Sequence, residues 1–175
     1  MLKKIIMLII ALLMLVSCGE SVDPALTPEE QEAVTLENAV RKALFNYHED
    51  GYKDGECEGV GFVIMGQADV DGNTHVYTIN MYGVYDRIND AMCKIDGHSC
   101  IPMVVVLDKK LRLVEVKEPV DGEGYMESVF NLFPEEYRTR IFDLSIEDYT
   151  TISAMEAACI SEYLEKKGLE MVIKQ

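Results

Sequence analysis

The sequence predicts an α+β domain in which a four-stranded antiparallel meander is packed by an N-terminal helix and by C-terminal helices. An amphipathic helical pattern precedes residue 50, strand patterns with short connections fill residues 60–116, and helical spacing returns after residue 125. Strands grouped together and flanked by helices are typical of α+β layer architectures. The length favours a single folded domain, which we assign to residues 28–175.

The first 17 residues have the pattern of a secretory signal. Two lysines precede an unbroken apolar run, Ile5 to Val16, which is short for a membrane span. The segment Leu15–Cys18 then resembles a bacterial lipobox. The resemblance implies cleavage before Cys18 and lipidation of its thiol, with acyl chains such as palmitate. We therefore expect an extracytoplasmic lipoprotein, anchored to the cell membrane or the outer membrane.

Residues 18–27 contain Gly, Ser, Asp and Pro with little apolar periodicity, which predicts a flexible tether. The next segment, Thr27–Glu30, has an N-cap residue, a proline at the first helical position and a glutamate three residues after the cap. Apolar residues then recur at helical spacing as far as Tyr47. We expect a helix here, with fraying or a break near Thr35 and Asn38.

Four strands are expected next, at residues 60–68, 75–85, 101–107 and 111–116. Asp71 and Gly72 lie between the first two strands and tolerate the positive φ angles of a tight hairpin. Residues 86–99 are expected to form a long loop. The run at 101–107 is almost wholly apolar, which predicts a central strand covered on both faces.

Helices are expected to follow residue 119. Met126 begins a set of apolar residues at helical spacing, and Pro134 restarts a helix with glutamates in its first turn. Ser145 together with Asp148 then forms a cap for the last helix, which we expect to end at Gly168.

The net charge excludes one class of partner. The chain carries a formal charge of −15, and removal of Lys3 and Lys4 with the signal makes it still more negative. Nucleic acids and anionic lipid head groups require basic patches. We therefore expect no nucleic acid as a partner, attachment to the membrane through the lipid anchor, and an envelope protein or peptide as the binding partner.

Four cysteines remain once Cys18 is assigned to the lipid, and an even number outside the cytoplasm permits two disulfides with three pairings. Cys93 and Cys100 bracket the end of the expected loop, so they form one candidate disulfide. Cys57 and Cys159 form the second candidate. A buried, free Cys159 is the alternative to that second bond.

The remaining chemistry-bearing residues give no catalytic or metal-binding signature. The acidic turn at 69–73 lacks the glycine position and the final glutamate of a calcium loop. Cys93, His98 and Cys100 do not match the spacing of zinc ligands. A thiol nucleophile at Cys57 or Cys93, with His75 or His98 as its base, has no family signature around it. We expect no cofactor, no metal and no catalytic residue.

One side chain is a candidate for a contact surface. In the second strand, alternation places Tyr77, Ile79, Met81 and Tyr85 on one face and Tyr82 on the other. The face that carries Tyr77 and Tyr85 is the more apolar, which favours the core. Tyr82 is therefore the tyrosine that we select as a candidate contact residue, if its face is exposed.

Several segments are similar to a known module. These are Gly61–Gly66, Val76–Tyr85, Val105–Lys109, Pro119–Gly122 and Leu132–Pro134. In this order they resemble the extracellular C-terminal domain of BlaR/MecR-type membrane metallopeptidases of Firmicutes, over residues 60–163. The resemblance implies an outward-facing module for sensing or binding. The peptidase motif His-Glu-x-x-His is absent from this sequence, and Phe62 stands where we expect many relatives to have histidine.

From the sequence we expect a lipid-anchored extracytoplasmic binding or sensing domain that is not an enzyme. The rival hypothesis is a small envelope hydrolase or a thiol-dependent enzyme.

Overall fold

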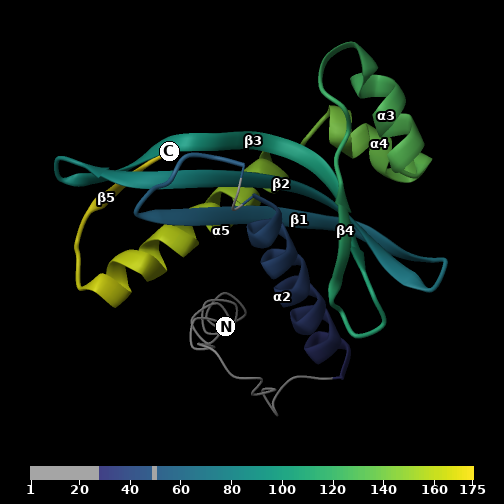
Figure 1. Cartoon of the computed structure of the whole chain (residues 1–175), viewed down its shortest axis with the longest axis horizontal. Coiled ribbons are helices and arrows are strands. Elements are labelled where there is room, and N and C mark those ends of the chain that lie inside the picture. Colours follow the sequence, from purple (N-terminus) through teal and green to yellow (C-terminus); the bar gives the residue numbers. More distant parts are fainter. Residues whose placement is uncertain (1–27, 49–50) are drawn as a thin grey trace, which may run out of the picture. The chain divides into compact units, whose positions relative to one another are not determined.

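The structure is a computed structural model that describes residues 28–48 and 51–175, with side chains from Thr35 onward. The expected signal segment 1–17, the lipidated Cys18 and the tether 18–27 lie outside the described residues. Residues 36–175 belong to one compact unit, and all contacts given below lie within it. This unit is α+β, with helices laid against a mostly antiparallel, curled sheet (Figure 1).

In chain order, the described elements are helix α2 (Pro28–His48), strands β1 (Cys57–Val70), β2 (Asn73–Ile88), β3 (Ala91–Leu107) and β4 (Leu113–Lys117), a 3-10 turn η2 (Gly122–Gly124), helices α3 (Tyr125–Leu132), α4 (Glu135–Phe142) and α5 (Ile146–Lys167), and strand β5 (Val172–Lys174). The strands are ordered β1-β2-β3-β4 in the sheet, and β5 pairs with β3 in parallel. The expectation of four strands missed β5. Three residues are too short for a recognisable strand pattern, and β5 is extended because it pairs with Ala91–Cys93 of β3.

The hairpin between β1 and β2 has the predicted turn. Val70 pairs with Asn73, so the loop consists of Asp71 and Gly72 alone. Both residues have positive φ angles, 52° and 82°, as a two-residue turn of this kind requires. The strands on either side are longer than their apolar patterns indicated, because backbone pairing continues through the polar residues that flank the turn.

The expectation of a long loop at residues 86–99 is wrong. Strand β2 continues to Ile88, the chain turns at Asn89, which has a φ of 57°, and β3 begins at Ala91. This stretch is polar and contains Gly97, so its local propensity for a strand is low. It is extended because β2 supplies partners for its backbone groups and because Met92 is fully buried.

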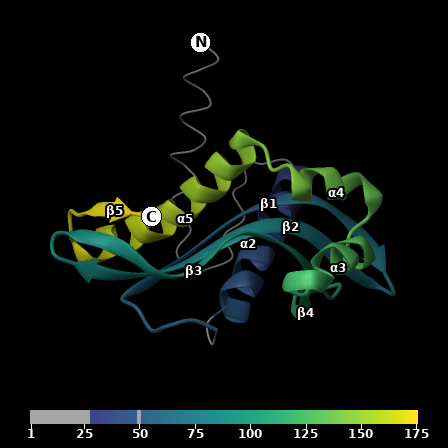
Figure 2. The ribbon, with the colours of Figure 1, turned by 90° about the horizontal axis from the view of Figure 1, so that it is seen from above.

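Helices cover both faces of the sheet. Val40, Ala43 and Leu44 of α2 pack against residues of β1, β2 and β3, including Val60 and Val105. The opposite face is covered by α5, through Ile152 and Ile160, and by α3, through Val129. Figure 2 shows α5 and α4 along one side of the sheet. The apolar run at 101–107 is therefore central and covered on both faces, as predicted.

Helix α5 lies unusually close to β1, and glycine makes this approach possible. A Cβ atom on Gly61 would fall 1.8 Å from the carbonyl oxygen of Ile152, and one on Gly59 would fall 2.7 Å from that of Glu156. No side chain fits in such a gap. The helix itself begins and ends as predicted, since the Ser145 side chain accepts a bond from the Asp148 amide and Gly168 has the left-handed C-cap conformation.

This approach gives a stability prediction. We expect Gly61→Ala to lower the free energy of unfolding by about 3 kcal/mol, because the added methyl group must displace the backbone of α5. Chemical denaturation measures the change. The matched control is Gly51→Ala, whose Cβ would lie at an ordinary 3.5 Å from the His48 carbonyl oxygen. Equal stabilities of the two variants would contradict the close helix contact.

Candidate functional site

The candidate site is a cluster of imidazole and phenol rings where the C-terminal end of α2 meets the sheet. His48 is the last residue of α2 and is buried, with 4% of its surface exposed. It lies over Asn80 and Tyr82 of β2 and beside His98 of β3. Tyr52 follows the helix and packs over the same rings. We call these five residues the histidine cluster.

An irregularity in strand pairing aims His98 at α2. Asn80 pairs with Ile101, whereas Tyr82 pairs with His98, so β3 has an extra residue in this interval. Such bulges redirect side chains. Gly97, with a φ of 122°, allows the turn of the backbone, and a Cβ there would lie 2.2 Å from the carbonyl oxygen of Tyr82. The glycine and the bulge together place the His98 ring over Tyr82.

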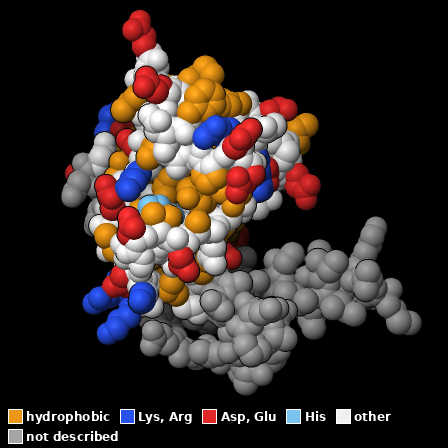
Figure 3. Space-filling view, turned by 90° about the vertical axis from the view of Figure 1, so that its right-hand side faces the viewer, with side chains coloured by type: hydrophobic (Ala, Val, Ile, Leu, Met, Phe, Trp, Pro, Cys, Tyr) orange, Lys and Arg blue, Asp and Glu red, His pale blue; other side chains and the backbone are white. Residues whose placement is uncertain are grey.

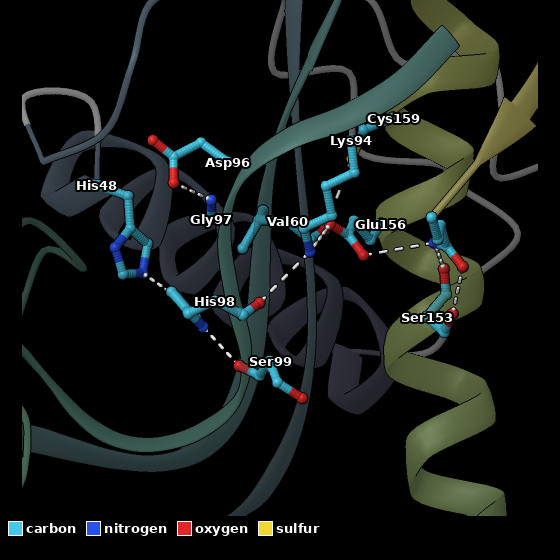
Figure 4. A network of polar contacts seen from close by, with 11 residues as sticks. His48, Val60, Lys94, Asp96, Gly97, His98, Ser99, Ser153, Glu156 and Cys159 are labelled. Carbon is cyan, nitrogen blue, oxygen red and sulfur yellow. Dashed lines mark hydrogen bonds and ion pairs between the residues drawn. The ribbon is translucent and has the colours of Figure 1, made fainter. Parts of the chain in front are cut away.

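Direct polar contacts join the two histidines. Their Nε2 atoms lie 3.2 Å apart, and the Nε2 atom of His48 is also 3.4 Å from Oδ1 of Asn80. Nδ1 of His98 lies 2.5 Å from the carbonyl oxygen of Ser99. Figure 4 shows both rings pointing toward one another across the gap between α2 and β3. The amide nitrogen of Asn80 donates to the Ile101 carbonyl oxygen at 3.0 Å, which orients Oδ1 toward His48.

The rings stack closely around these contacts. The centroid of the His48 ring lies 4.7 Å from those of both Tyr82 and His98. Tyr52 stacks on Tyr82 at 5.2 Å. Aromatic contacts of this kind exclude water and lower the local dielectric, which strengthens the polar interactions inside the cluster.

Burial keeps both imidazoles neutral. It lowers the pKa of His48 to about 4, with the neighbouring His98 adding to the effect and the Asn80 contact opposing it. The pKa of His98 is also lowered, again mainly by burial, while its contact with the Ser99 carbonyl opposes the shift and the charge of Lys94 adds to it. Neutral imidazoles carry lone pairs, so both rings can accept a hydrogen bond or bind a metal.

A buried ion pair lies on the far side of β3. Glu156 of α5 has no exposed surface and accepts a bond from the Lys94 ammonium at 2.9 Å. Lys94 also approaches the carbonyl oxygen of His98, at 3.4 Å. Gln175 reaches the second carboxylate oxygen of Glu156, at 3.3 Å, and the hydroxyl group of Ser153. Figure 4 shows this network running from His98 to α5.

The structure does not support the expected disulfide between Cys93 and Cys100, and the four described cysteines are not bonded to one another in it. Cys93 and Cys100 lie on the single strand β3, where extended backbone separates residues seven positions apart by about 20 Å, far beyond disulfide reach. The loop that was to join them does not exist. The Cys159 thiol lies 3.6 Å from the Val60 carbonyl oxygen. The bond between Cys57 and Cys159 stays a prediction.

The thiol and metal combinations considered from the sequence are not brought together. Cys100 packs with Ile79 and Ile152 on the α5 face, whereas His98 faces α2. Burial and nearby acidic groups raise the pKa of Cys57 to about 11, which opposes a thiolate nucleophile there. His75 lies near the start of β2, opposite Val106. Within the described ranges, no three His, Cys, Asp or Glu side chains converge as metal ligands.

Tyr82 is not a contact residue, and this expectation is corrected. Its side chain is fully buried, because α2 covers the face that alternation left open. Phe62 lies under the same helix, with the Arg41 guanidinium 5.5 Å from the centre of its ring. Sequence reasoning assigned the two faces of β2 but missed His48, whose only signal was its place at the end of an amphipathic helix.

Large apolar side chains are exposed on α3 and α4. Met126, Phe130 and Phe142 have roughly half of their surface exposed, and Tyr125 contacts Phe142. The Phe130 and Phe142 rings meet edge to face at 6.2 Å. We call these four residues the α3–α4 apolar surface. In Figure 3, hydrophobic side chains gather at the top of the molecule, where Figure 1 places α3 and α4.

The neutral histidines give a pH dependence of stability. The pKa of His48 is near 6.5 in the unfolded chain and about 4 in the folded one, so only the unfolded state gains its proton between these values. The neutral His48 therefore contributes its full stabilisation above pH 6.5. The free energy of unfolding falls by on the order of 3 kcal/mol as the pH is lowered from 6.5 to 4. Denaturation across this range should show a steeper loss in the wild type than in His48→Gln. Identical pH profiles would contradict a buried neutral His48.

The buried ion pair gives a second prediction. Lys94→Met leaves the Glu156 charge buried without its partner, and we expect a loss of about 3 kcal/mol in the free energy of unfolding. The double variant Lys94→Met with Glu156→Gln should recover most of this loss, because no buried charge remains. As a control, Arg87→Met breaks the exposed pair with Glu56 and should cost less than about 1 kcal/mol. Similar losses for Lys94→Met and Arg87→Met would contradict the buried pair.

None of the helices in the described part of the chain combines the length and apolar character needed to span a bilayer. Comparisons of the chain with known protein families, with curated proteins and with solved structures gave no match.

Proposed function

We propose that the protein is a lipid-anchored, extracytoplasmic binding domain that contacts a partner protein or peptide in the cell envelope and is not an enzyme. The observation that carries this proposal is the exposed α3–α4 apolar surface. Protein interfaces are enriched in Tyr, Phe, Met and Arg. The α3–α4 apolar surface consists of Tyr, Met and Phe side chains. An arginine adjoins it, because the Arg138 guanidinium lies 5.1 Å above the Phe130 ring.

Hydrogen bonds and core packing hold the α3–α4 apolar surface in a fixed conformation. Arg138 donates hydrogen bonds to the carbonyl oxygens of Phe130 and Phe133, so α4 is fastened to the end of α3. Below it, Val129 and Phe133 pack on Tyr77 and Val104 of the sheet. Apolar side chains that are exposed on a rigid base lose little conformational entropy when a partner covers them. The arrangement therefore favours binding by surface contact.

The anchor defines where the partner lies. With Cys18 lipidated, the ten residues 18–27 can span at most roughly 35 Å, which limits the distance between the bilayer and the start of α2. The strongly negative charge of the chain opposes binding to anionic head groups. A protein or peptide of the envelope fits both conditions better than the lipid surface itself.

We also propose that β1–β4 form the antiparallel meander of the extracellular domain of BlaR/MecR-type peptidases, with α2 and the C-terminal helices packed on it. This proposal rests on the similar sequence segments within residues 60–163, and the strand order β1-β2-β3-β4 supports the meander alone. The relationship would make the protein a sensing or accessory module. The rival thiol-dependent enzyme has less support, because the raised pKa of Cys57 and of Cys100 opposes a reactive thiolate.

The anchor is tested by Cys18→Ser. We expect the wild type to incorporate labelled palmitate and to sediment with membranes, because acylation of this thiol attaches the chain to the bilayer. The variant should lose the label and leave the membrane fraction after the signal is removed. Cys159→Ser serves as the control and should keep both properties. Palmitate incorporation that is unchanged in Cys18→Ser would refute the anchor.

The binding surface is tested by photo-crosslinking in cells. A photoreactive amino acid at Phe142 should form a crosslink to one defined envelope protein, and Phe130→Glu should abolish that crosslink. Ile88, at the β2–β3 turn, is a matched control position because its exposure of 49% is close to the 47% of Phe142. If positions 88 and 142 captured the same proteins equally, the α3–α4 apolar surface would not be the interface.

A further inference from the structure

We propose that His48 and His98, together with Asn80, form a binding site for a divalent transition-metal ion of the Zn²⁺ class. This inference goes beyond the proposed function and does not depend on the α3–α4 apolar surface. It rests on two short contacts of His48 Nε2, one with Nε2 of His98 and one with Oδ1 of Asn80, which bring donor atoms together from α2, β2 and β3.

The separation of the two nitrogens suits a shared metal. Zn²⁺ binds imidazole nitrogen at about 2.0–2.1 Å, so two ligands of a tetrahedral ion lie about 3.3 Å apart. The Nε2 atoms of His48 and His98 lie 3.2 Å apart. The Oδ1 atom of Asn80 is 3.4 Å from Nε2 of His48, which is also close to an edge of such a tetrahedron. A small movement of side chains would therefore place one ion at bonding distance from the two imidazole nitrogens, with Oδ1 of Asn80 as the donor next to His48.

The second ring nitrogen of His98, Nδ1, makes the kind of hydrogen bond that commonly orients a metal-binding histidine. Nδ1–H of His98 donates to the carbonyl oxygen of Ser99, which leaves the lone pair on Nε2 directed at His48. His48 Nε2 then carries the hydrogen that lies between the two rings. A metal ion takes the place of this hydrogen, which moves to Nδ1 of His48. The charge of both rings stays neutral throughout.

The donor set selects the class of ion. Imidazole nitrogen suits Zn²⁺, Ni²⁺ and Cu²⁺, whereas Ca²⁺ and Mg²⁺ require a shell of oxygen atoms. Asn80 contributes one neutral oxygen, and its orientation is held by the bond from its amide nitrogen to Ile101. The remaining coordination position is left for water or for an atom of a bound partner. Two imidazole nitrogens and one neutral oxygen predict weaker Zn²⁺ binding than three histidines would give.

The surroundings provide both enclosure and access. The rings of Tyr52 and Tyr82 cover the two histidines, while His98 is only half-buried and Ser99 beside it is exposed. An ion can therefore approach along β3. The nearby Lys94 ammonium is paired with Glu156, and the Asp96 carboxylate lies two residues from His98 in the same strand, so negative charge offsets that of Lys94. The local charge therefore does not exclude a cation.

The experiment is a calorimetric titration of the full chain with Zn²⁺, with Ca²⁺ as the comparison ion. We expect saturable binding of one Zn²⁺ per chain and no comparable binding of Ca²⁺. His98→Gln and His48→Gln should each weaken Zn²⁺ binding about tenfold or more. His75→Gln is the matched control, because His75 lies near the other end of β2, and it should bind Zn²⁺ like the wild type.

Further variants keep the test decisive. Because His48 is buried, its variant can lose stability, so the half-buried His98→Gln is the deciding substitution and thermal denaturation verifies its fold. Asn80→Asp places a charged oxygen at the same position and should tighten Zn²⁺ binding. Absence of saturable binding would overturn the proposal. So would binding that persists in His98→Gln, which would indicate the free thiols, or binding that is lost in His75→Gln.

Discussion

The packing of α5 against β1 is the contact on which the arrangement of this domain depends. The helix reaches the sheet because Gly59 and Gly61 leave no side chain between the two backbones. At this distance Ile152 and Ile160 are fully buried against β2 and β3, and Glu156 is carried into the interior. Apolar burial of this extent outweighs the desolvation of the carboxylate only because Lys94 and Gln175 pair with it.

That contact also explains why the two polar networks lie on opposite sides of one strand. Lys94 of β3 pairs with Glu156 toward α5, whereas His98 of the same strand faces α2. A second irregularity in the pairing, where Val84 pairs with Asp96 but Tyr85 pairs with Lys94, separates the two directions, and the Lys94 ammonium lies 3.4 Å from the His98 carbonyl oxygen. Lys94 therefore contacts both Glu156 of α5 and the backbone of His98 in the histidine cluster. This continuity joins the core to the candidate metal site without a flexible segment.

The α3–α4 apolar surface and the histidine cluster have different physical characters. On α3 and α4, large apolar side chains are exposed above a packed base, which is unfavourable in water until something covers them. In the histidine cluster, polar atoms are withdrawn from water and held by one another and by stacked rings. The first arrangement suits recognition of a macromolecule and the second suits a small ion.

Local sequence patterns determined much of this fold. The turn at Asp71 and Gly72, the cap at Ser145, the end of α5 at Gly168 and the two faces of β2 all depend on neighbouring residues, so a single stretch of sequence carries the information. These features follow from backbone preference and periodicity, which act over a few residues.

Tertiary structure decided the rest. Residues 91–100 are extended because β2 pairs with them, although their own composition favours a loop. Tyr82 is buried because α2 happens to cover its face, and β5 forms only beside β3. The histidine cluster joins His48 and His98 through strand register and a bulge, which no pattern within either segment contains. Contacts between residues 50 positions apart require the whole chain to fold, because the free energy that holds them comes from the shared core.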